Sequence, residues 1–197
     1  MTLEIPDESL RDAQPKAALT VRKLKEVTIY TDGGAQGNPG PGGYGVVLIC
    51  GKHRKELSGG FRFTTNNRME LMAAIVGLQA LKLRCRVRLF SDSKYLVDAV
   101  EKRWAEHWRR RNWRRKEDEP ALNPDLWERL LDLCRKHQVR FEWLRGHAGH
   151  KENERCDQLA TQAAQKKDLP ADQPFESLQN GRRGRPLLDA DPQRPTA

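Results

Sequence analysis

The sequence has no long hydrophobic run, and apolar residues make up only 37% of its 197 positions. A membrane-spanning helix needs about 20 consecutive apolar residues, so we expect no part of the chain to cross a membrane. The N-terminal stretch is acidic and lacks the continuous apolar core of a secretory signal peptide. These absences favour a soluble, cytoplasmic protein.

Cysteine is also scarce, and its four positions are scattered. Cys50, Cys85, Cys134 and Cys156 form no C-x-x-C pair, and no histidine stands at zinc-ligand spacing from them. Neither a disulfide framework nor a structural zinc site is indicated. We expect reduced, buried thiols.

Acidic residues are outnumbered, with 27 Asp and Glu against 36 Lys and Arg, and the formal net charge is +9. The segment 102–116 carries eight basic residues and one acid, Glu106. Such a concentration of one sign is suited to the phosphates of a nucleic acid. It differs from the mixed-sign pattern of an ordinary solvated helix face.

The length allows one compact domain with spare ends. We place this domain at residues 26–167, with its basic protrusion at about 102–120. Residues 1–25 are a polar arm, and residues 168–197 are rich in Pro, Gly, Asp and Gln, so we expect a disordered tail. The tail includes RRGRP at 182–186, which is similar to the core of an AT-hook, but a solvated end is the favoured interpretation.

Period-two patterns predict strands at residues 27–32, 44–50, 53–62, 87–92 and 139–144. The first three are separated by short turns and form an antiparallel meander. The fourth is reached through a helix, so we expect it to lie parallel to the first. The expected fold is therefore α/β, a mixed sheet flanked by helices.

Helical spacing and capping residues predict the helices. Thr64 to Asn67 offer N-caps for a helix whose apolar residues include Leu71 and Leu78. A second helix begins at Ser93 and continues through the basic segment. Further helices are expected at 123–136 and 152–164.

Two acids follow strands of this predicted sheet, Asp32 and Asp92. Neighbouring parallel strands bring their carboxyl ends to one edge, where open α/β sheets bind ligands. Glu70 would stand above them in the first turn of its helix. Each acid alone has an ordinary explanation, a solvated turn for Asp32 or a favourable helix dipole for Glu70.

A glycine-flanked histidine, His147, and a helical acid, Asp157, follow the last strand. Alone, each is typical of a solvated surface residue. Several carboxylates in one cleft repel one another unless a divalent cation neutralises them. Mg²⁺ prefers oxygen ligands, and a pair of ions stabilises both the entering and the leaving oxygen of a phosphoryl displacement.

Six motifs in order now suggest a family. They are TDGGAQGNPGPGGYG, TTNNRMEL, SDSKYL, the Trp/Arg segment, NPDLW and RGHAGHKENERCDQLA, spread over about residues 25–167. In this order they resemble the bacterial type 1 ribonuclease H family. The resemblance implies a five-stranded mixed sheet and an endonuclease that cuts the RNA strand of RNA–DNA hybrids with Mg²⁺, leaving 5′-phosphate and 3′-hydroxyl ends. It also implies one or two ions per chain, with Mn²⁺ as a substitute, and no obligate protein partner. We expect a monomer, since the sequence shows no spare apolar surface.

The resemblance also assigns roles to single residues. The metal-binding acids would be Asp32, Glu70, Asp92 and Asp157, and His147 would handle protons or assist product release. Substrate contacts fall into three groups, the minor-groove amides Asn38, Asn66 and Asn67, the DNA-phosphate residues Thr65 and Asn123, and the protrusion residues Trp104, Arg109, Arg110 and Arg111.

Some residues depart from the family pattern. Lys94 stands where many relatives have Gln, and Phe63 occupies a position that is often basic. Trp104 and Trp108 share a helical face and could simply anchor their helix on the core. A non-catalytic hybrid-binding module, or another polynucleotidyl transferase or resolvase of the superfamily, remains the alternative function.

Overall fold

The structure is a computed structural model that describes residues 24–116, 119–146 and 148–183, with side chains up to Asn180. Most of the N-terminal arm, His147 and most of the RRGRP segment lie outside the described residues. No helix in the described part is both long and apolar enough to span a bilayer.

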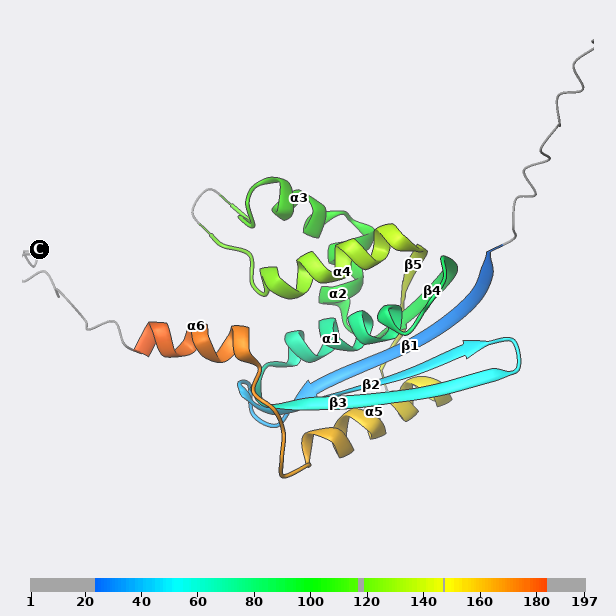
Figure 1. Ribbon diagram of the computed structural model, residues 1–197, viewed down its shortest axis with the longest axis horizontal. Helices are drawn as coiled ribbons and strands as arrows, with labels where there is room; N and C mark the ends of the chain where they lie inside the picture. Colours follow the sequence, from blue (N-terminus) through cyan, green and yellow to red (C-terminus); the bar gives the residue numbers. More distant parts are fainter. Residues whose placement is uncertain (1–23, 117–118, 147, 184–197) are drawn as a thin grey trace, which may run out of the picture.

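A five-stranded mixed sheet forms the centre of the molecule (Figure 1). Three strands form an antiparallel meander, β1 (Lys25–Ala35), β2 (Gly40–Cys50) and β3 (His53–Thr64). β4 (Cys85–Ser91) pairs parallel with β1, and β5 (Gln138–Trp143) pairs parallel with β4. The order β3-β2-β1-β4-β5 confirms the predicted mixed sheet.

Helices cover both faces of this sheet. In chain order they are α1 (Asn66–Gln79), α2 (Lys94–Glu101), α3 (Trp104–Arg110), α4 (Pro124–Lys136), α5 (Lys151–Ala164) and α6 (Gln173–Arg183). Figure 1 shows α1 to α4 on one side of the sheet and α5 on the other. The main core lies on the α1 side, where Ile29, Leu71 and Leu89 are fully buried, and a smaller cluster under α5 contains Val47 and Cys156.

Helix α1 packs unusually close to β1, and Gly33 makes this possible. A Cβ atom at Gly33 would lie 2.3 Å from the carbonyl carbon of Met69 and 2.6 Å from the backbone nitrogen of Glu70. Neither backbone atom can move without displacing the helix. The neighbouring Gly34 has no atom within 4 Å of the equivalent point.

Thr65 is confirmed as an N-cap, but two other helix predictions were wrong, the turn that holds Glu70 and the continuation of the second helix. Thr65 caps α1 by accepting a hydrogen bond from the backbone N–H of Arg68 (3.4 Å), so Glu70 falls in the second turn rather than the first. The helix expected from Ser93 through the basic segment breaks at Arg103, whose φ is +57°. The break redirects the chain, so that Trp108 packs edge-on against Trp127 in the core.

The disorder expected after residue 168 was also wrong for residues 173–183, which form α6. Three tertiary contacts hold the start of this helix. Asp172 pairs with Arg68 (2.6 Å), Glu176 pairs with Arg62 (2.8 Å), and the ring of Phe175 lies 5.7 Å from that of Phe63. The polar composition gave no sign of these partners, which are about 100 residues away in the chain.

The two arginines that hold α6 are in different environments. The Arg68 side chain is 2% exposed and donates to both Asp172 and Asp125, while that of Arg62 is 62% exposed. Asp172 also accepts a hydrogen bond from the hydroxyl of Thr64 (2.7 Å). The buried network and the surface pair should therefore contribute very differently to stability.

We expect Arg68→Met to lower the free energy of unfolding by about 3–5 kcal/mol, because it leaves Asp172 charged and buried without its partner. Arg62→Met is the matched control and should cost less than about 1 kcal/mol, since its ion pair is solvent-exposed. Urea denaturation of both variants measures the difference. Equal losses would contradict the assigned roles.

Substitution of the adjacent glycines tests the contact between β1 and α1. Gly33→Ala should destabilise the protein by about 3 kcal/mol or more, because the new methyl group overlaps backbone atoms of α1. Gly34→Ala adds the same group in open space and should change stability by less than about 0.5 kcal/mol. Thermal unfolding of the two variants is the measurement, and a tolerated Gly33→Ala would show that α1 is not held where described.

Candidate active site

Three acids meet at the carboxyl edge of the parallel strands. Thr31 and Ser91 are paired in the register of β1 and β4, so Asp32 and Asp92, which directly follow them, lie side by side. Glu70 approaches them from α1. Carboxylate oxygens of the three residues all lie within 4.8 Å of one another. The predicted convergence of these acids is confirmed.

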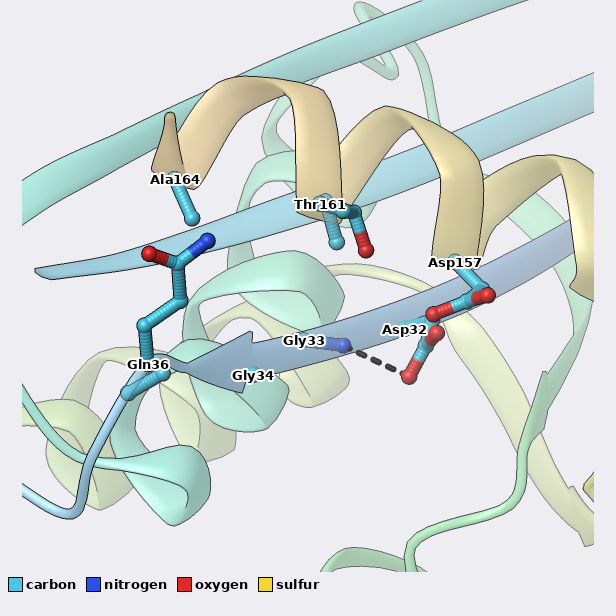
Figure 2. A pocket seen from close by; sticks show the side chains of 9 residues that line it. Asp32, Gly33, Gly34, Gln36, Asp157, Thr161 and Ala164 are labelled. Carbon is cyan, nitrogen blue, oxygen red and sulfur yellow. Dashed lines mark hydrogen bonds between the residues drawn. The ribbon is translucent and has the colours of Figure 1, made fainter. Parts of the chain in front are cut away.

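Short-range hydrogen bonds orient the cluster. Asp32 accepts from the backbone N–H of Gly33 (2.8 Å; Figure 2). Glu70 accepts a long bond from the hydroxyl of Ser91 (3.5 Å), and Asp92 accepts from the side-chain amide of Asn153 (3.4 Å). The acids are thus held by neutral donors as well as by the packing of their elements.

Electrostatics make this cluster costly when all its members are charged. Burial raises the pKa of the Glu70 carboxyl well above its ordinary value, and the charges of Asp32 and Asp92 raise it further. Both effects disfavour the ionised form. A cation between the carboxylates would reverse the electrostatic part of this cost.

Asp157 reaches the same region from the other face of the sheet. Figure 2 shows its carboxylate on α5 beside that of Asp32. Both line a cavity of about 190 Å³ with Gly33, Gln36 and Thr161. Asp157 is not one of the three acids that lie within 4.8 Å of one another. The fourth predicted acid therefore adjoins the cluster without belonging to its centre.

Glycines of β2 let α5 pack closely against the sheet, which brings Asp157 beside Asp32 (Figure 2). A Cβ atom at Gly43 would lie 2.1 Å from the carbonyl oxygen of Ala160, and one at Gly45 would lie 2.0 Å from that of Cys156. Side chains at these two positions would push the helix away from the sheet. The glycine-rich sequence of β2 thus positions a site residue more than 100 positions later.

Sequence reasoning missed two residues that contact Asp92. Asn153 is 3% exposed, and its Oδ1 has no hydrogen-bond partner among the described residues. Gly146 lies so close that a Cβ atom there would be 2.6 Å from Asp92 Oδ2. Both belong to the RGHAGHKENERCDQLA motif, whose histidine and aspartate attracted the functional interpretation. His147, which follows Gly146, lies outside the described residues.

The predicted substrate residues lie next to the acids. The Asn38 side chain accepts a bond from the backbone N–H of Asn66 (3.2 Å), and the Asn66 side chain accepts one from the N–H of Ala35 (2.7 Å). These bonds tie the glycine-rich loop to the start of α1. Asn38, Thr65, Asn67 and Asn123 line one groove of about 410 Å³.

The side chains of the basic segment differ in their partners and in their exposure to solvent. Arg109 forms ion pairs with Glu128 and Asp132 of α4, whereas Arg110 and Arg111 are exposed. Trp104 is 43% exposed and lies under the ammonium group of Lys102, while Trp108 is buried. Core anchoring is thus the correct interpretation for Trp108 and the wrong one for Trp104.

Lys94 and Phe63, the two residues that depart from the family pattern, each contact an aromatic residue of this chain. The Lys94 ammonium lies 4.7 Å from the centre of the Trp143 ring, and the Trp143 indole N–H donates to the backbone carbonyl of Asp92 (2.9 Å). Phe63 packs against Phe175, so its aromatic ring helps to hold α6. In each case the unusual residue contacts a neighbour within this chain.

Comparisons with known proteins agree with this geometry. The RNase H family model matches residues 24–165. Ribonuclease H of Desulforamulus reducens is 65% identical over 149 residues, which cover 76% of this chain and 94% of that relative. The carboxylate cluster, Asp157 and the groove residues from Asn38 to Asn123 all fall within the matched range.

Solved structures agree as well. LC9-RNase H1, described as a type 1 RNase H with the type 2 active-site motif, is 30% identical with a TM-score of 0.66 over 88% of this chain and 93% of that one. LC11-RNase H1, solved in complex with an RNA/DNA hybrid, has a TM-score of 0.55 at 24% identity over 70% of this chain and 96% of that one, a likeness of fold. Given the family-model match, the close relative and the carboxylate cluster, this chain belongs to the ribonuclease H family.

Proposed function

We propose that the protein is an endonuclease that hydrolyses the RNA strand of RNA–DNA hybrids with Mg²⁺. The observation that carries this proposal is the convergence of Asp32, Glu70 and Asp92 within 4.8 Å, in a chain of the ribonuclease H family. A groove lined by polar and apolar side chains, among them Asn38 and Thr65, supplies a place for the nucleic acid.

The acids fit a divalent cation by their chemistry. All three offer carboxylate oxygens, which Mg²⁺ prefers, and the burial of Glu70 disfavours its ionised form without a compensating charge. Asp32, Glu70 and Asp92, with Asp157 beside them, would hold one or two Mg²⁺ ions, with Mn²⁺ as a substitute. When bound, such ions stabilise the charge on the entering and leaving oxygens of a phosphodiester.

The proposed reaction exchanges one bond at phosphorus. The oxygen of a water molecule joins the phosphorus as the bond from phosphorus to O3′ of the RNA strand breaks. The products are a 5′-phosphate and a 3′-hydroxyl, with one water proton on O3′ and the other released. His147 would accept that proton or help the product to leave, a role proposed from its position in the motif.

Recognition of the hybrid would use the groups beside the acids. Amides of Asn38, Asn66 and Asn67 would face the minor groove, where the 2′-hydroxyl distinguishes RNA from DNA. Thr65 and Asn123 would receive a phosphate of the DNA strand. Trp104 and the exposed arginines of the protrusion would contact the same strand further along, with Arg109 held by α4.

The setting proposed for this activity is a monomer in the cytoplasm, without an obligate protein partner. The four cysteines are unpaired, as expected in a reducing compartment.

The first test is Asp32→Asn, which removes one carboxylate and keeps its shape. Cleavage of the RNA strand in a labelled hybrid should fall on the order of 1,000-fold or more, while hybrid binding persists. Asp98→Asn removes a surface carboxylate that pairs with Lys102 and should leave cleavage unchanged.

The same assay on RNA duplex, DNA duplex and hybrid, with Mg²⁺ or EDTA, separates the proposal from a non-catalytic module and from a resolvase. Cutting confined to the RNA of the hybrid, and only with metal, is expected. An Asp32→Asn variant that cuts at a comparable rate would refute the role of that residue.

The protrusion is tested through the salt dependence of binding. Arg110→Glu with Arg111→Glu should weaken hybrid binding and reduce the slope of log Kd against log salt by about one unit for each phosphate that the protein no longer neutralises. The control pair is Arg84→Glu with Arg86→Glu. These residues flank Cys85, the first residue of β4, and thus lie at the opposite end of the strand from Asp92. If both double variants change the slope equally, the effect reflects net charge and the protrusion has no special role.

A further inference from the structure

Helix α6 forms one wall of the groove that contains the predicted phosphate residues. Asn38, Thr65 and Asn67 form one side, residues 120–124 form a second, and Phe175, Leu178 and Gln179 of α6 form the third. The family model ends at residue 165, so this third wall comes from a part of the chain that the model does not include. Figure 1 shows α6 projecting from the edge of the molecule near the start of α4.

This wall is firmly attached at its base. The guanidinium of Arg68 makes two bonds to Asp172, of 2.6 and 2.8 Å, immediately before the helix. Phe175 is 9% exposed and packs on Phe63. Because Arg68 itself lines the groove, the contact that holds α6 is continuous with the predicted phosphate site.

The lining of the groove combines amides with exposed apolar side chains. Leu122 is 54% exposed and Leu178 is 57% exposed, one on each of two walls. Asn123 and Gln179 contribute amide groups, and none of the described residues that line the groove is Asp or Glu. Its volume of about 410 Å³ lies within the range of roughly 300–1,000 Å³ typical of ligand sites.

A deoxyribose-phosphate backbone has matching chemistry. Its phosphate oxygens accept hydrogen bonds from amides, and the C2′ methylene of deoxyribose is apolar. Ribose carries a hydroxyl at that carbon, which would lose its water against a leucine without gaining a partner. A wall of leucine and amide side chains therefore favours a DNA strand over an RNA strand.

We propose that α6 extends the nucleic-acid site of this protein, with Gln179 contacting a phosphate and Leu178 contacting a deoxyribose of the DNA strand. This inference rests on the proposed function, since it assumes a hybrid bound across the carboxylate cluster. It adds a contact outside the matched domain, and it makes α6 a determinant of which strand occupies the groove.

Charge substitution on α6 provides the first test. Leu178→Glu places an acid in the groove, whereas Ser177→Glu places the same charge on an adjacent exposed residue that does not line it. In EDTA, hybrid binding measured by fluorescence anisotropy should weaken about fivefold or more for Leu178→Glu and less than about twofold for Ser177→Glu. Equal effects of the two substitutions would overturn the proposal.

A second test measures the contact between Leu178 and the sugar. Single ribonucleotides are placed along the DNA strand of the hybrid, and binding is measured for wild type, Leu178→Ala and the control Ser177→Ala. We expect one or two adjacent positions where ribose weakens wild-type binding about fivefold. This penalty should vanish in Leu178→Ala and persist in Ser177→Ala. A scan in which Leu178→Ala changes no position would overturn the deoxyribose contact.

Failure of this inference can be told apart from failure of the proposed function. Cleavage of the RNA strand by wild type with Mg²⁺ depends on the carboxylate cluster and tests only the proposed function. If wild type cuts the hybrid and both α6 tests are negative, the inference alone is wrong. If wild type neither cuts nor binds the hybrid, the proposed function fails, and the inference about α6 fails with it.

Discussion

The close approach of three carboxylates is the constraint on which the rest of the structure depends. Like charges within 4.8 Å repel, and burial of Glu70 increases the cost. The fold must therefore supply the energy to hold them together. It does so by placing Asp32 on β1 and Asp92 directly after β4, which pairs parallel with β1, and by packing α1 against Gly33, where no side chain intervenes.

Close packing at glycines and buried polar contacts connect the three acids to the surrounding helices. Gly43 and Gly45 let α5 lie against β2, which brings Asp157 to the edge of the cluster. On the opposite side, Arg68 is two residues before Glu70 on α1 and binds both Asp125 at the start of α4 and Asp172 before α6. Helix α1 thus connects the acids to the start of α4 and to α6, on two sides of the neighbouring groove.

The proposed nucleic-acid surface is built from residues that are held in place to different degrees. The side chains of Asn38 and Asn66 each accept a hydrogen bond from a backbone N–H, whereas Arg110 and Arg111 are exposed at the end of a short helix. Firm groups suit recognition of a fixed sugar and phosphate geometry, and flexible cations suit attraction of any polyanion. The family resemblance covers both kinds, while α6 lies beyond it.

Local patterns in the sequence determined the five strands, most of the helices and three of the acids as a converging set, because alternation and helical spacing depend on neighbouring residues. Only the tertiary structure decided which basic residues are held by partners, that Arg103 breaks a helix, and that Asn153 and Gly146 contact Asp92. It also turned part of an expected disordered tail into α6. The contacts responsible join residues far apart in sequence, such as Arg68 and Asp172, and composition within a window carries no information about such partners.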